Sequence, residues 1–212
     1  MEQQLNPAKP RRRRRRGRRI LAILGYIVVA LGIAWFFELR LPTTVIFVRH
    51  ADTDAAMEQG GDPSLNANGR ARAEALADFM QDIDVIASVK AIYASEARRT
   101  QQTAEPLAKR LGLEVEIADP YDVDRFMRHV LRDHKGEIVL IVTHKDAIAP
   151  LVDELHGHQS LPEIAADEYD NVYIVTIPFW GKVKTLRLHY GPTDATLGLS
   201  GGSSTTTLTG PR

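Results

Sequence analysis

The sequence lacks cysteine altogether: none of its 212 residues carries a thiol. Disulfide bonds, thiolate catalysis and cysteine-based metal sites are therefore excluded. The absence leaves the cellular compartment open, because a domain with a good core needs no disulfide outside the cell. Apolar residues make up 44% of the chain, which excludes a chain disordered by composition. The length allows one ordinary domain with appendages, and we find no internal repeat.

The chain also lacks a net charge, with 27 basic and 27 acidic residues, but the two signs are unevenly distributed. Residues 1–19 hold Lys9 and eight arginines against Glu2, whereas residues 20–212 hold 18 basic and 26 acidic residues. A basic head on an acidic body indicates an anionic partner for the head alone. Nucleic acid and the anionic face of a membrane are the two candidates.

An uncharged segment from Ile20 to Phe37 follows the basic head. Eighteen helical residues span about 27 Å, close to the thickness of a bilayer hydrocarbon core. Trp35 lies at the far end, where aromatic side chains favour the membrane interface. We therefore expect a membrane anchor over residues 20–39, with anionic lipid at the arginine-rich head and no nucleic acid partner. The alternatives are a cleaved signal peptide, for which Ala30–Ala34 offers small residues, and a buried core helix.

The position of the arginines also predicts an orientation. Positive charges flank the cytoplasmic side of membrane helices, so the N-terminus is expected in the cytoplasm. Everything after Arg40 would then lie outside the cytoplasm as part of a single-pass inner-membrane protein, in the periplasm if the cell is Gram-negative. The sequence gives no indication of oligomeric state.

Four regions follow along the chain. We expect a basic disordered head (1–19), the anchor (20–39), a folded domain (43–190), and a disordered tail (191–212) whose Gly, Ser and Thr residues have little to bury.

Apolar runs alternate with helical patterns within the folded domain. Strands are expected at 44–48, 91–94, 113–117 and 137–142, helices at 68–81, 99–111, 124–133 and 147–155, and a terminal hairpin at 171–188 with its turn at 178–181. Such alternation predicts an α/β fold, a three-layer sandwich with a mostly parallel central sheet flanked by helices.

Polar residues follow three of the predicted strands directly. They are Arg49-His50, Ser95 with the arginines after it, and Thr143-His144. Sites in such sheets form beyond the carboxyl ends of the strands. Arginine forks match phosphate oxygens, and a helix beginning near Arg99 would add backbone donors. A partly neutral imidazole among these cations can attack phosphorus, while the second histidine donates to the phosphoryl group.

These three blocks together resemble the histidine phosphatase superfamily, also called the phosphoglycerate mutase-like family. Its Arg-His-Gly-acid-Thr signature stands here as Arg49-His50-Ala51-Asp52-Thr53. Its second block is similar to the run Ser95–Ala104, in a register that selects Arg99 as the phosphate ligand. Its third block, an apolar strand followed by a small residue and histidine, matches Thr143-His144. The resemblance covers roughly residues 44–188.

The resemblance implies hydrolysis of a phosphorylated small molecule through a phosphohistidine on His50. Arg49, Arg99 and His144 would hold the phosphoryl oxygens, with Thr53 and Ser95 also at the substrate. No metal or organic cofactor is expected. Lys145 either extends the anion site or faces solvent.

The family's usual glutamate acid cannot be placed in this sequence. The candidates are Asp122 and Asp124, after the third predicted strand, although either could instead cap the following helix. Without an acid, esters of poor leaving alcohols would react slowly, while phosphoramidates would suffer less.

Three rival hypotheses remain. The pocket could belong to an inactive module that binds a phosphorylated ligand, or to a phosphohistidine phosphatase acting on proteins, which fits the expected compartment poorly. The spacing of His50, Asp52 and Asp54, with His144, also mimics zinc or manganese ligands, although Arg49 and Arg99 would repel a cation.

Overall fold

A computed structural model describes residues 11–38, 41–54, 61–82, 88–155 and 161–191. It divides into two units, residues 1–41 and 42–212. The expected tail beyond 191 and residues 1–10 of the expected head lie outside the described residues.

The first unit contains one helix, α1 (Arg11–Glu38). Its stretch Arg19–Phe36 is long and apolar enough to cross a membrane, as expected from the sequence. The helix begins earlier than expected, because the arginine run that we assigned to a disordered head is helical from Arg11. Arginine has a high helix propensity, so the run extends the apolar helix that follows it.

The second unit is built around a six-stranded sheet with the order β3-β2-β4-β1-β5-β6. β1 (Thr43–Arg49), β4 (Ile138–Thr143), β2 (Val89–Ala94) and β3 (Val115–Ile117) are parallel. β5 (Asn171–Ile177) and β6 (Lys184–His189) are antiparallel additions beside β1. The mostly parallel sheet and the terminal hairpin confirm the fold class expected from the sequence.

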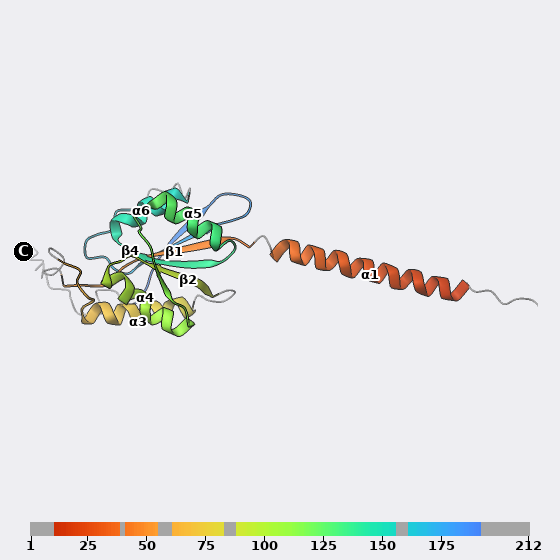
Figure 1. The fold of residues 1–212 in the computed structure, drawn as a ribbon, viewed down its shortest axis with the longest axis horizontal. Helices are drawn as coiled ribbons and strands as arrows, with labels where there is room; N and C mark the ends of the chain where they lie inside the picture. The colour runs from red at the N-terminus through yellow and green to blue at the C-terminus, as the bar shows by residue number, and fades with distance from the viewer. Residues whose placement is uncertain (1–10, 39–40, 55–60, 83–87, 156–160, 192–212) are drawn as a thin grey trace, which may run out of the picture. The chain divides into compact units, whose positions relative to one another are not determined.

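Helices cover both faces of the sheet, which makes the three layers visible in Figure 1. α3 (Ala67–Asp82) and α4 (Arg98–Leu111) lie on one face, and α5 (Val123–Asp133) and α6 (Lys145–Glu154) on the other. Each face has its own apolar core, one between the sheet and α3 and α4 and the other under α5 and α6. The central strands β1 and β4 are apolar over residues 45–48 and 138–142, as expected for strands with both faces buried.

Element boundaries differ from the expected ones by a few residues. Arg49 is the last residue of β1, α3 begins at Ala67, α6 begins at Lys145, and β3 is only three residues long. The start of α3 is set by Asn66, whose side-chain oxygen accepts the backbone N–H of Gly69 at 2.8 Å.

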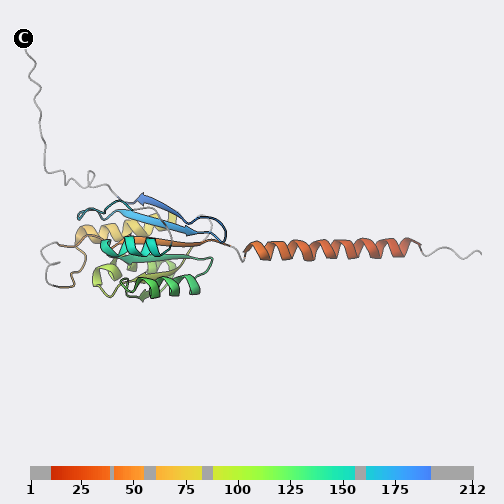
Figure 2. The same cartoon turned by 90° about the horizontal axis from the view of Figure 1, so that it is seen from above.

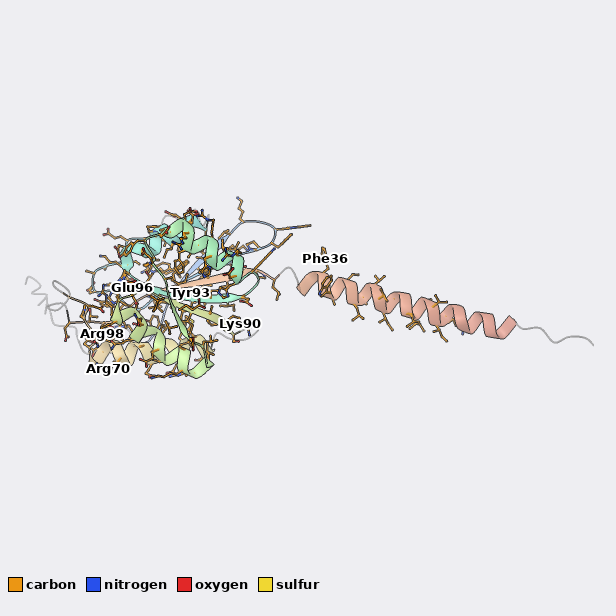
Figure 3. The ribbon with its side chains drawn as sticks, viewed as in Figure 1. Phe36, Arg70, Lys90, Tyr93, Glu96 and Arg98 are labelled. Carbon is orange, nitrogen blue, oxygen red and sulfur yellow. The ribbon has the colours of Figure 1, made fainter. Side chains whose placement is uncertain are left out.

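The carboxyl ends of β1, β2 and β4 meet at one edge of the sheet, as the parallel pairing requires. Figure 3 shows Glu96 and Arg98, which follow β2, at the end of the domain opposite to Lys90 near the start of that strand. We call this end the carboxyl edge.

Candidate active site

His50 follows β1 directly and is 5% exposed at the carboxyl edge. Its Nδ1 lies 2.9 Å from the carbonyl oxygen of Ala51. Since a carbonyl only accepts hydrogen bonds, Nδ1 carries the hydrogen and the lone pair lies on Nε2. Within the described residues Nε2 has no hydrogen-bond partner. His50 is therefore held in the tautomer that leaves Nε2 available as a nucleophile.

The surroundings of His50 favour its neutral form. The pKa of His50 is lowered to about 4, mainly by burial and also by the positive charges of Arg49 and Arg99, whereas the hydrogen bond to Ala51 acts in the opposite direction. The imidazole is therefore uncharged near neutral pH, with its lone pair unprotonated, as nucleophilic attack requires.

His144 lies beside His50, with ring centroids 5.5 Å apart in an edge-to-face arrangement. It occupies the N-cap position of α6, directly after β4. Its Nδ1 is 3.4 Å from a guanidinium nitrogen of Arg99, and its Nε2 is 3.0 Å from the hydroxyl of Ser95. Arginine only donates, so Nδ1 accepts and Nε2–H donates to Ser95. Burial, followed by the charge of Arg99, lowers the pKa of His144.

Arg99 extends from the first turn of α4 toward both histidines. Its Nε is buried and has no hydrogen-bond partner within the part of the chain that the structure describes. Its Nη1 lies 3.7 Å from the carboxylate of Asp62, which also accepts the backbone N–H of Arg98 at 2.9 Å. A partly buried guanidinium with an unused, buried Nε donor is suited to an anionic ligand.

Arg49 reaches away from β1 to the segment before β5. Its Nη1 donates to the carbonyl oxygens of Ala165, Ala166 and Glu168 at 3.2, 2.9 and 3.0 Å. Its guanidinium also lies 3.9 Å from the ring centroid of Tyr169, which itself stands 5.9 Å from the His50 ring. Arg49 thus joins β1 to the segment that precedes β5.

Residues of the second motif hold the loop after His50 in place. The hydroxyl of Thr103 accepts the backbone N–H of Ala51 at 2.9 Å and lies 2.7 Å from the carbonyl oxygen of Arg99. Gln102 accepts the N–H of Leu65 at 2.8 Å. These contacts fix the nucleophile relative to Arg99, so part of the motif acts by positioning.

The other expected substrate residues have different surroundings. Thr53 is buried and forms an isolated β-bridge with Leu65, whereas Ser95 contacts His144 directly. Lys145 is exposed at the start of α6 and lines a hollow of 220 Å³ that does not include His144.

The two acid candidates taken from the sequence lie on or before α5. Asp124 pairs with Arg128 on the exposed face of that helix. Asp122 occupies the N-cap position of α5 but makes no capping hydrogen bond there. Both Asp122 and Arg128 line a hollow of 580 Å³ whose lining does not include His144.

A second hollow, of 270 Å³, contains His144. The carboxylates in its lining are Glu96 and Asp119, neither of which the sequence had suggested. Tyr121 also lines it, and its ring stacks on His144 with centroids 6.2 Å apart and planes 7° apart. The sequence pattern indicates only the aspartates of the loop after β3, whereas the structure adds Tyr121 from that loop as an aromatic wall.

In the structure, the two aspartates of the predicted metal site, Asp52 and Asp54, interact with other side chains. Asp52 forms a buried ion pair with Arg72 at 2.5 Å, and Asp54 lies 3.4 Å from the side-chain amide of Asn66. Among the described residues, the group close enough to share a cation is Glu168, Asp170 and His189, and Arg187 is paired with Glu168 there.

Comparison with known proteins agrees with this fold. The sequence profile described as histidine phosphatase superfamily (branch 1) matches residues 45–120, a segment that runs from β1 past β3. A search of curated protein sequences found no match. This part of the chain is therefore similar to the histidine phosphatase superfamily in its sequence profile.

Solved structures that are similar in fold include several described as phosphatases. A mycobacterial glucosyl-3-phosphoglycerate phosphatase is 16% identical with a TM-score of 0.54, covering 72% of this chain and 100% of its own. The alpha-ribazole phosphatase of Shigella flexneri is 17% identical with a TM-score of 0.54, covering 69% and 96%. A phosphoserine phosphatase from Entamoeba histolytica, solved with 3-phosphoglyceric acid, is 13% identical with a TM-score of 0.51, covering 72% and 98%.

Proposed function

We propose that the folded domain, residues 43–190, is a phosphohydrolase that acts on a phosphorylated small molecule through a phosphohistidine on His50. The observation that carries the proposal is the neutral His50 ring, held by Ala51 so that Nε2 is available beside Arg99 and His144. A phosphohistidine route is general in the histidine phosphatase superfamily, which supports this assignment.

In the proposed first step, Nε2 of His50 attacks phosphorus and the bond to the leaving oxygen breaks. Arg99 neutralises charge on the phosphoryl oxygens through its unused Nε donor, and Arg49 adds positive charge behind the nucleophile. His144 donates a hydrogen bond to the same group once it turns from Ser95. In the second step water attacks phosphorus, the P–N bond breaks, and phosphate leaves.

We propose Asp119 as the group that protonates the leaving oxygen. It lines the same hollow as His144, and its carboxylate accepts the backbone N–H of Tyr121 at 2.9 Å, which holds it at the rim. Asp122 and Asp124 remain the alternatives taken from the sequence, but Asp124 is engaged by Arg128. An acid matters most for alcohols that are poor leaving groups.

A phospho-ligand-binding module is the second candidate function. The observation in its favour is the engagement of Arg49, whose Nη1 donates to three carbonyl oxygens of the segment 165–168. With that nitrogen engaged, the pocket offers a phosphoryl group fewer donors, which favours binding over rapid turnover.

We also propose that α1 anchors the chain in a membrane, with the N-terminus in the cytoplasm and the domain outside it. The span Arg19–Phe36 and the arginines before it support this arrangement. Anionic lipid would neutralise the arginine run.

Phosphate release from p-nitrophenyl phosphate and a panel of small phosphate esters tests the catalytic proposal. Wild-type protein is compared with His50→Ala, both with chelator present. We expect release that survives chelation and disappears in the variant. A folded wild type no more active than His50→Ala would contradict the proposal and favour the binding module.

The leaving-group dependence tests Asp119 separately. Asp119→Asn should slow hydrolysis of alkyl phosphates by about 100-fold, the usual contribution of a general acid, and leave p-nitrophenyl phosphate nearly unchanged. Asp122→Asn is the matched control and should change neither. The reverse pattern would return the acid role to Asp122.

A further inference from the structure

The turn between β5 and β6 exposes two neighbouring aromatic side chains. Phe179 is 47% exposed and Trp180 is 77% exposed, and their ring centroids lie 6.0 Å apart. We call residues 178–183 the aromatic turn. Single exposed apolar residues are common on protein surfaces, but an exposed Phe-Trp pair at the tip of a hairpin is a coherent apolar feature.

Lysines surround this aromatic pair. Lys182 and Lys184 are exposed on the turn and at the start of β6, and the ammonium group of Lys135 lies 5.9 Å from the ring centroid of Phe179. The neighbouring carboxylate of Glu137 is paired with His134. The tip thus combines aromatic rings with a cationic rim.

Strand register fixes where the aromatic turn lies in the domain. Thr43, the first residue of β1, pairs with Ile177, the last residue of β5. Figure 2 shows the hairpin turn, in blue, at the same end of the domain as the start of β1, in orange. Only residues 39–42 separate Thr43 from the last residue of α1. The aromatic turn therefore lies beside the point where the chain enters the domain.

We infer that the aromatic turn docks on the lipid surface of the membrane that α1 crosses, an inference that rests on the proposed anchor. Trp and Phe favour the membrane interface, where an apolar ring meets water, and lysines attract anionic headgroups. A second copy of the chain fits the tip less well, because symmetric pairing would bring the lysines of both copies together.

This docking has a consequence for the active site. β1 runs from Thr43, beside the aromatic turn, to Arg49, before His50. Seven residue steps of about 3.3 Å from Thr43 to His50 place the nucleophile about 23 Å from the docked end. The carboxyl edge then faces away from the bilayer, open to water-soluble phosphorylated substrates.

Tryptophan fluorescence tests the inference in the full chain, because the sequence contains only Trp35 and Trp180. The Trp35→Phe variant reports the aromatic turn alone, and the Trp180→Phe variant reports the anchor alone. Each is reconstituted into vesicles of equal phosphatidylcholine and phosphatidylglycerol, with and without bromine on the acyl chains. Bromine quenches tryptophans that reach the bilayer.

We expect brominated lipid to reduce tryptophan emission in both variants. Adding Lys182→Glu and Lys184→Glu together should weaken the quenching of Trp180 and leave that of Trp35 unchanged. Quenching of Trp35 without quenching of Trp180 would overturn docking of the turn and leave the anchor intact. Quenching of neither would overturn both. A third outcome would identify a second copy as the occupant and overturn the lipid assignment. In it, brominated lipid has no effect on Trp180, and aqueous iodide quenches Trp180 less as the protein concentration rises.

Discussion

At the scale of the residue, the protonation state of His50 is the feature on which the proposed chemistry depends. The ring is buried, donates from Nδ1 to Ala51, and faces the positive charges of Arg49 and Arg99. Each of these features except the hydrogen bond favours the neutral form. Lysine at position 99 would retain one charge but lose the planar fork of donors.

The lowered pKa of His50 predicts the pH dependence of turnover. With a pKa of about 4 in the folded protein, the nucleophile stays neutral well below the ordinary value of 6.5. After correction for the ionisation of the substrate, kcat/KM should stay level from pH 7 down to about pH 5 and fall toward pH 4. A pH–rate profile of wild type measures this, and an acid limb centred near pH 6.5 would contradict a neutralising pocket.

The same shift predicts how stability depends on pH. Between pH 6.5 and about 4 the unfolded chain binds a proton at His50 that the folded chain does not, so stability falls as pH falls through this window. Relative to His50→Gln, wild type should lose up to roughly 3 kcal/mol over that range. Urea unfolding at several pH values checks it, and parallel curves for the two proteins would refute the burial of an uncharged ring.

At the scale of the element, the loop after β1 is held by contacts from both α3 and α4. A Cβ added at Gly69 would lie 2.1 Å from the backbone oxygen of Asp52, so α3 can approach this loop only through a glycine. Thr103 on α4 satisfies the backbone N–H of Ala51 from the other side. The two helices thereby determine where His50 sits.

Gly69→Ala should destabilise the domain by about 2 kcal/mol or more, because the backbone of Asp52 must move. Exposed Asn68→Ala on the same helix is the matched control, with an expected change within about 0.5 kcal/mol. Chemical denaturation of both variants provides the measurement. Equal stabilities would mean that α3 and the loop are less closely packed than the structure has them.

Thr103→Val keeps the shape of the side chain but leaves the buried N–H of Ala51 without its acceptor. We expect a loss of about 1–3 kcal/mol of stability, together with a lower kcat as the nucleophile shifts. Thr103→Ser retains the hydroxyl and should recover most of both quantities. If Val and Ser behaved alike, the hydroxyl would have no positioning role.

The sequence predicted those parts of the site that depend on strand order. Parallel pairing brings His50, Ser95 and His144 to one edge, and each follows an apolar run that is readable without a structure. The places of Tyr169 and Asp62 in the site could not be predicted, because both come from loops, whose paths depend on tertiary contacts. One such contact is that of Arg49 with Ala166 and Tyr169. Asp119 and Asp122 lie in the same loop, and the path of that loop decides which of them lines the hollow with His144.

At the scale of the whole molecule, charge and hydropathy are divided along the chain. The arginine run, the apolar span and the acidic domain follow each other in order, and the apolar span is long enough to cross a bilayer. A cleaved signal peptide would account for the same pattern only if the segment were removed.

The proposed anchoring by α1 predicts that the mature protein retains residues 1–40 and stays with membranes through alkaline carbonate extraction. The intact mass of the membrane-fraction protein checks the first point, and fractionation checks the second. A soluble product that begins after the alanines at 30 and 34 would instead establish a cleaved signal peptide.

The central claim is that His50 carries the phosphoryl group during turnover. The most direct measurement mixes the full chain with p-nitrophenyl phosphate, stops the reaction within the first turnovers at alkaline pH, where a P–N bond survives, and locates the phosphoryl group by peptide mass spectrometry. We predict phosphorylation of His50 in wild type and none at that site in His50→Ala. Turnover without any phosphorylated His50, or with phosphate on another residue, would contradict the account.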